Sequence, residues 1–94
     1  MARSLQNNAV TVTTSATLMV DGNPNRTLLT FTNNGSVDVF LGGSSVSSSA
    51  YVWPLASGAT VQFTSVDGDV APMAKWYGVT GASSASVSVG EVTR

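Results

Sequence analysis

The sequence predicts an all-β fold, and three observations support this prediction. The chain contains fourteen valines and eleven threonines against six leucines and no isoleucine, a composition typical of strands. Residues that favour surface helices are scarce, since glutamate and lysine occur once each. Short alternating apolar and polar runs are separated by turn residues, without a helical period. We therefore expect a compact antiparallel β-sandwich or jelly-roll-like barrel of seven or eight short strands.

The length of 94 residues predicts a single domain. Its first eight residues, MARSLQNN, show no period, so we expect a flexible N-terminal arm over residues 1–8 and one sandwich domain over residues 9–94. A domain of this size buries only roughly 60 to 65% of the surface of its unfolded chain. Contacts with partner subunits would therefore add to its stability.

Two strands are expected before residue 21. Val10 and Val12 alternate with threonines in the first strand, which breaks at residues 14–15, and residues 16–20 form the second. The next six residues, DGNPNR, favour a loop, because Gly and Asn accept positive φ and Pro24 disfavours helix before it.

The most regular pattern is RTLLTFTNNGSVDVFLGG, residues 26–43. Two alternating runs flank the turn sequence NNGS, which predicts a β-hairpin. Leu28 and Phe40 point away from the main apolar face, so both faces of this hairpin are expected to be partly covered. The main apolar face consists of Leu29, Phe31, Val37, Val39 and Leu41.

The remaining elements are shorter. The serine-rich stretch GGSSVSSSA, residues 42–50, predicts an exposed connection. Residues 51–53 are extended, Pro54 marks a strand edge or end, and residues 59–66 alternate as a strand. Two more runs follow turns at DGD and GASS: KWYGVT and residues 85–92.

Composition argues against enzymatic activity. The chain lacks cysteine and histidine, which removes disulfides, thiol nucleophiles, the commonest general base and the usual zinc ligands. Lys75 is the one candidate base for a serine nucleophile, and no G-x-S-x-G motif is present. We predict no enzyme and no cofactor.

Asp67 and Asp69 flank a glycine and offer two interpretations beyond a turn. Their oxygens could bind calcium, but the twelfth position of the corresponding EF-hand loop is Gly78 instead of glutamate. Two carboxylates are also the minimum for a glycosidase, yet nothing predicts an acid in a cleft. We favour a polar turn and predict no metal site.

Charge excludes further classes of function. Nine charged residues give a net charge of -1, which argues against nucleic-acid binding. No apolar run approaches the ~20 residues of a membrane span, and no signal peptide is apparent, so we expect a soluble chain made in the cytosol. Charged residues make up 10% of the chain against about 25% in ordinary domains. Either much of the surface faces another protein, or hydroxyl groups keep the chain soluble.

Two further features suggest a binding surface. Tyr51, Trp53, Trp76 and Tyr77 would suit a platform for sugar rings, although large aromatic residues in a small sandwich more often fill a core or an interface. Arg26 would anchor a carboxylate on a neighbouring subunit, or equally pair within the chain, for example with Asp38.

The segments NRTLLTFTNNGSVDVFLGGSSVSSS, WPLASGATVQF and KWYGVTGASSASVSVGEV together resemble small virion proteins of tailed bacteriophages. The resemblance covers roughly residues 25–92, whereas residues 1–20 match no such motif. The positions that fit the pattern are Arg26, Leu29, Phe31, Asn33, Asn34, Gly35, Val39, Phe40, Leu41, Gly42, Pro54, Leu55, Gly58, Trp76, Tyr77, Val79 and Val89.

Within that group the chain is most similar to capsid decoration, or cement, proteins. The resemblance implies a virion protein on the head surface, made in the host cytoplasm, that binds the major capsid protein as a homo-oligomer, with a trimer favoured. The alternatives are a tail, fibre or head-fibre component, or a carbohydrate-binding module, recognising a host glycan. The expected partner-interface residues are Arg3, Leu5, Gln6, Arg26, Trp53, Trp76 and Tyr77.

Overall fold

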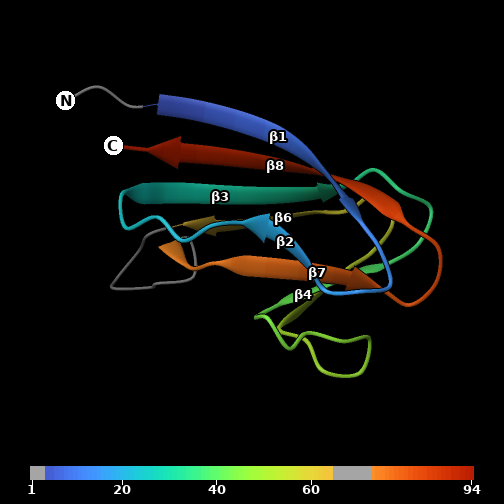
Figure 1. Ribbon diagram of the computed structural model, residues 1–94. Helices are drawn as coiled ribbons and strands as arrows, with labels where there is room; N and C mark the ends of the chain where they lie inside the picture. Colours follow the sequence, from blue (N-terminus) through green and yellow to red (C-terminus); the bar gives the residue numbers. More distant parts are fainter. Residues whose placement is uncertain (1–3, 65–72) are drawn as a thin grey trace.

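The structure is built from β-strands in two layers. The computed structural model describes residues 4–64 and 73–94. Two four-stranded antiparallel sheets have the strand orders β1-β8-β3-β6 and β2-β7-β4-β5 (Figure 1), which confirms the predicted all-β class. The strands are β1 (Ser4–Val12), β2 (Thr17–Val20), β3 (Arg26–Asn33), β4 (Val39–Gly42), β5 (Trp53–Leu55), β6 (Thr60–Thr64), β7 (Trp76–Thr80) and β8 (Ala85–Thr93).

The core lies between the two sheets and follows the period of two in the sequence. Alternate residues of each long strand point inward, and the apolar ones are almost fully buried except Val10, which is partly buried. β8 shows this most clearly, because buried Ala85, Val87 and Val89 alternate with exposed serines. The buried core cluster consists of Val12, Met19, Leu29, Phe31, Val39, Leu41, Leu55, Val61, Trp76, Ala85, Val87 and Val89.

The hairpin predicted over residues 26–43 is wrong. β3 pairs with β6 and β8, whereas β4 pairs with β5 and β7, so the chain crosses from one sheet to the other. The predicted apolar faces of the two runs are correct. The two faces belong to different sheets, however, and meet across the core of the sandwich. Alternation reports which face of a strand is buried and says nothing about which strand lies beside it.

Asn33 organises this crossing. Its side-chain amide donates to the carbonyl oxygens of Val37, at 2.8 Å, and Leu55, at 3.1 Å, while its Oδ1 accepts the backbone N–H of Gly35 at 2.9 Å. A Cβ on Gly35 would lie 2.5 Å from the Cβ of Ala85, so the connection passes too close to β8 for any other residue. Asn-Asn-Gly therefore makes a connection between sheets here.

Residues 4–8, expected to belong to a flexible arm, form the first half of β1. Ser4 to Asn8 pair with Thr93 to Val89 of β8 in an unbroken register. Backbone hydrogen bonding needs no side-chain period, so a run of polar residues can extend a strand where its neighbour continues. Residues 1–3, the end of the strand expected at 59–66, and the turn at Asp67 and Asp69 lie outside the described residues.

Candidate functional site

The outer edge of β1 is the longest free strand edge among the described residues. β1 lies at the border of its sheet (Figure 1) and has nine residues, against five, four and three in the other border strands β6, β2 and β5. It contains no charged residue and no proline, and its register with β8 has no bulge. An edge of this kind is ready to pair with another chain.

β2 and β5, the edges of the second sheet, carry a bulge and a proline that β1 lacks, although the N–H of Ala9 in β1 donates to Oδ1 of Asn8 at 3.0 Å. β2 has an irregular register between Leu18 and Val20, which disturbs any further pairing. β5 has Pro54 at its centre, where the missing N–H removes a donor. Short strands, bulges and prolines are the devices by which sheets avoid association at their edges.

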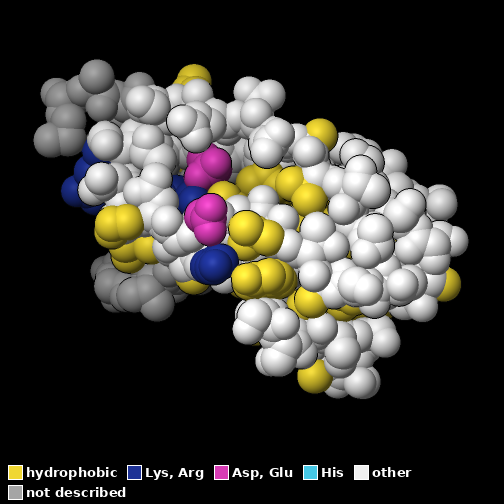
Figure 2. All heavy atoms as spheres, in the orientation of Figure 1, with side chains coloured by type: hydrophobic (Ala, Val, Ile, Leu, Met, Phe, Trp, Pro, Cys, Tyr) yellow, Lys and Arg dark blue, Asp and Glu magenta, His cyan; other side chains and the backbone are white. Residues whose placement is uncertain are grey.

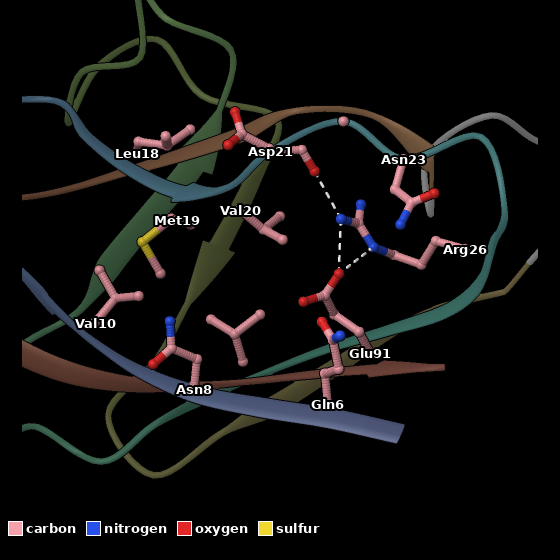
Figure 3. A pocket seen from close by; sticks show the side chains of 12 residues that line it. Gln6, Asn8, Val10, Leu18, Met19, Val20, Asp21, Asn23, Arg26 and Glu91 are labelled. Atoms are coloured by element: carbon pink, nitrogen blue, oxygen red, sulfur yellow. Dashed lines mark hydrogen bonds and ion pairs between the residues drawn. The ribbon is translucent and has the colours of Figure 1, made fainter. Parts of the chain in front are cut away.

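A cleft of about 440 Å³ opens between β1 and β2, beside this edge (Figure 3). Gln6, Asn8 and Val10 point into it from β1, because they lie opposite the inward-facing residues Glu91, Val89 and Val87 of β8. Gln6 and Asn8 nevertheless remain exposed, since the second sheet does not reach over them. The remaining lining residues are Leu18, Met19, Val20, Asp21, Gly22, Asn23, Arg26, Val89 and Glu91.

Arg26 lines one end of the cleft (Figure 3). It is only 2% exposed, and its Nε and Nη2 contact Oε1 of Glu91 at 2.8 and 2.7 Å. Nη2 also donates to the carbonyl oxygen of Asp21 at 2.6 Å, and Nη1 donates to that of Ala74 at 3.2 Å. One guanidinium therefore joins β3, β8, the end of β2 and the start of β7.

The structure pairs Arg26 within the chain, with Glu91 instead of Asp38. Asp38 lies beside the β3–β4 connection, where its Oδ1 accepts the backbone N–H of Ser57 at 3.3 Å. Arg26 stands at the opposite end of β3. Because β3 and β4 are not hairpin partners, nothing brings these two side chains together.

The outer face of the first sheet is polar and uncharged over most of its area. Thr11, Ser86, Ser88, Thr32 and Thr60 occupy it, and the Oγ1 atoms of Thr32 and Thr60 lie 2.8 Å apart. At one end, Leu5, Val92 and Leu28 are direct neighbours on three adjacent strands and form an apolar row. Leu5 is 80% exposed. This face can approach another protein without dehydrating charged groups.

Charge is concentrated near the cleft. On the face shown in Figure 2, acidic and basic side chains gather in one region, and most of the remaining surface is uncharged. Asp21, at the rim of the cleft, has Nζ of Lys75 3.9 Å from its Oδ1, with both side chains largely exposed. Together with Arg26 and Glu91, this gives two ion pairs and no net charge.

The four large aromatic residues considered as a sugar platform do not share one surface. Trp76 is 5% exposed and stacks on Phe63, with ring centroids 4.7 Å apart. Trp53 meets Phe63 edge-on at 6.3 Å, at the border of the core. Tyr51 instead packs against Phe40, at 4.9 Å, on the outward side of the second sheet.

The residues expected at a partner interface are therefore dispersed. Leu5 and Gln6 lie on β1 but on its opposite faces, and Arg26 is almost fully buried and lines the same cleft as Gln6. Trp53 is 44% exposed, and Arg3 is outside the described residues. Trp76 is in the core and Tyr77 is partly buried on β7. The sequence analysis did not identify Asn8 as a site residue. Extending the alternation backwards from Val10 would have placed Asn8 on the same face of the strand.

The described residues contain no group of three or more acidic side chains that could hold a metal ion, and Asp67 and Asp69 are not among them. No helix in that part of the chain is long and apolar enough to span a membrane. Comparisons with protein-family models, with curated protein sequences and with solved structures found no match. The resemblance to phage virion proteins therefore stays a prediction.

Proposed function

We propose that this chain is a non-enzymatic structural protein of a tailed-phage virion that binds the outer surface of the assembled head and stabilises contacts between capsomers. The observation that carries the proposal is the free, uncharged, unbulged edge of β1. An isolated domain with such an edge is liable to associate, whereas an assembly component uses the edge for binding. The major capsid protein is the proposed partner.

Strand addition supplies the contact. A partner segment that pairs with β1 gains main-chain hydrogen bonds along nine residues, and these bonds do not depend on charged side chains. The adjoining outer face of the first sheet is uncharged, so it can lie against several subunits at low desolvation cost. The row of Leu5, Val92 and Leu28 adds apolar area at the end of the same face.

Multiple copies multiply the effect of each contact. In the proposed arrangement the chain forms a homo-oligomer, with a trimer favoured by the resemblance to decoration proteins. Linking several weak sites in one oligomer raises its effective affinity by orders of magnitude, roughly 10² to 10⁴-fold. A repeated surface such as a phage head offers the matching array of sites.

The test is co-sedimentation of the purified protein with undecorated, expanded phage heads, after its mass has been measured by light scattering. We expect an oligomer that pellets at a fixed stoichiometry. A variant lacking residues 1–8 should remain in the supernatant, since it has lost half of the β1 edge but keeps Val10 and Val12, the residues of β1 that contact the core.

Thermal unfolding of both proteins is the control, and similar transitions would show that the truncated variant is folded. Failure of the full-length protein to pellet with heads would refute the proposal. Equal pelleting of the truncated variant would show that β1 is not the contact.

A further inference from the structure

We infer that the cleft between β1 and β2 receives side chains of an extended, uncharged segment of another protein that pairs with the free edge of β1. The cleft and the edge are adjacent, because Gln6, Asn8 and Val10 belong to the edge strand and line the cleft (Figure 3). This deepens the proposed function. The identity of the partner as a head protein rests on the proposed function, whereas the binding surface is argued from the structure itself.

The pleat of the sheet fixes where the partner's side chains go. A strand added to β1 continues the alternation of the sheet, so every second side chain points toward the second sheet, level with Gln6, Asn8 and Val10. Neighbouring inward-facing side chains are then about 7 Å apart along the strand. Main-chain bonds to β1 provide affinity, and the cleft selects the alternate side chains.

The cleft has an apolar floor and a polar mouth, and the polar part is formed by Gln6, Asn8, Asp21, Asn23, Arg26 and Glu91. Val10, Met19, Val20 and Val89 line it from both sheets. Met19 is 4% exposed and Val89 2% exposed, so the floor is part of the core. An apolar side chain placed there extends the core, whereas a polar one would lose its hydration without a matching partner.

The charges around the cleft favour a neutral partner. Glu91 is neutralised by Arg26 at 2.7 Å, and the rim carboxylate of Asp21 lies near Lys75. Within the described residues the side chain of Gln6 makes no hydrogen bond, which leaves its amide available to a hydroxyl or amide of the segment. Threonine, serine or asparagine suits the positions at the mouth.

A second copy of this chain fits the cleft poorly. Antiparallel pairing of two β1 strands centred on Asn8 would place Gln6 and Val10 of one copy opposite Val10 and Gln6 of the other. The inserted side chains would then be mainly amides, and two clefts would face each other with their apolar floors incompletely covered. A foreign strand with apolar residues at alternate positions covers them better.

The experiment is a titration of the isotopically labelled full chain followed by NMR. One probe is a capped nine-residue peptide in which Leu or Val alternates with Thr, and the other has the same composition with its apolar residues adjacent in pairs. We expect only the alternating peptide to shift the backbone amides of residues 4–12 together with the methyl groups of Val10, Met19 and Val89.

Two charge variants sharpen this titration. Asn8→Lys places an ammonium in the cleft, solvated in the free protein but buried under a bound strand, and should weaken peptide binding by at least about tenfold. Ser84→Lys adds the same charge at an exposed residue between β7 and β8 and should leave binding unchanged.

Three results would overturn the inference. In the first, the alternating peptide causes no shift. In the second, shifts are confined to the outward-facing residues Leu5 and Val92. In the third, β1 signals shift when the protein concentration is raised without any peptide. The last would assign the edge to a second copy. The titration contains no phage heads, so the two proposals can fail separately. Absence of peptide binding would overturn the inference about the cleft, and failure to pellet with heads would overturn the proposed function.

Discussion

At the scale of single residues, two buried polar side chains with several hydrogen bonds each lie at the two ends of the sandwich. Arg26 joins four segments at the end beside the cleft, and Asn33 joins the β3–β4 connection to β5 at the other. Both are almost fully buried. Such groups are tolerated in a core because their hydrogen bonds are satisfied, and they become costly when one partner is removed.

Replacing Arg26 should therefore destabilise the fold strongly. Arg26→Met leaves the Glu91 carboxylate, 15% exposed, without its nearby counter-charge and frees the carbonyl oxygens of Asp21 and Ala74. We expect a loss of about 3 to 5 kcal/mol in the free energy of unfolding, measured by urea denaturation.

The matched control for this change is Lys75→Met, which removes the exposed pair with Asp21 at 3.9 Å and should cost less than about 1 kcal/mol. Equal effects of the two substitutions would show that the Arg26 network does not hold the sheets together.

Gly35 provides a second residue-scale prediction. Gly35→Ala brings a Cβ within 2.9 Å of the Cα of Ala85, backbone that cannot move without displacing β8. We expect a loss of about 1 to 3 kcal/mol in urea denaturation. Gly43→Ala is the control, because no atom lies within 4 Å of the added Cβ, and it should be neutral or stabilise by up to about 1 kcal/mol. A neutral Gly35→Ala would mean that the crossing is less tightly packed than the structure indicates.

At the scale of elements, β8 is the central support of the first sheet. It pairs with β1 over nine residues on one side and with β3 on the other. β1 pairs on one side only. The backbone N–H groups of β8 therefore face a paired strand on either side, whereas every second N–H group of β1 faces the free edge.

Amide hydrogen exchange should reveal this difference. In β8 neighbouring amides are both expected to exchange slowly, because each faces a paired strand. In β1 slow and fast amides should alternate, since every second N–H points to the free edge. Exchange measured by NMR at low protein concentration tests this. Uniformly slow exchange along β1 would indicate that its edge is already covered in the purified protein.

At the scale of the whole molecule, the low charge has a consequence for binding. The chain carries nine charged residues in 94, and the four around the cleft form two ion pairs. Association through hydrogen bonds and apolar contacts is little affected by salt, because few counter-ions are released and few charges are screened.

The proposed binding to phage heads should accordingly be almost independent of ionic strength. We expect the apparent affinity in co-sedimentation to change by less than about threefold between about 0.05 M and about 0.5 M sodium chloride. Thermal unfolding at both concentrations controls for changes in stability. A loss of tenfold or more would mean that charged groups dominate the contact, contrary to an interface built on β1 and the uncharged outer face.

The fold class and the inward faces of most strands follow from the order of residues alone. Alternation of Leu29 with Phe31, and of Val87 with Val89, is a local property of a pleated strand with one buried face, so the sequence contains it in full. The absence of histidine and cysteine likewise limits the chemistry open to the chain, whatever its fold.

The pairing of strands and the place of the candidate site depend instead on tertiary contacts. NNGS is compatible with a hairpin or with a crossing between sheets, and contacts of Asn33 and Gly35 with β5 and β8, distant in sequence, select the crossing. Gln6 and Asn8 have no apolar period, and their place in β1 follows from the length of β8 beside them. The cleft exists because β2 ends at Val20 while β1 and β8 continue, a comparison between strands that no local pattern contains.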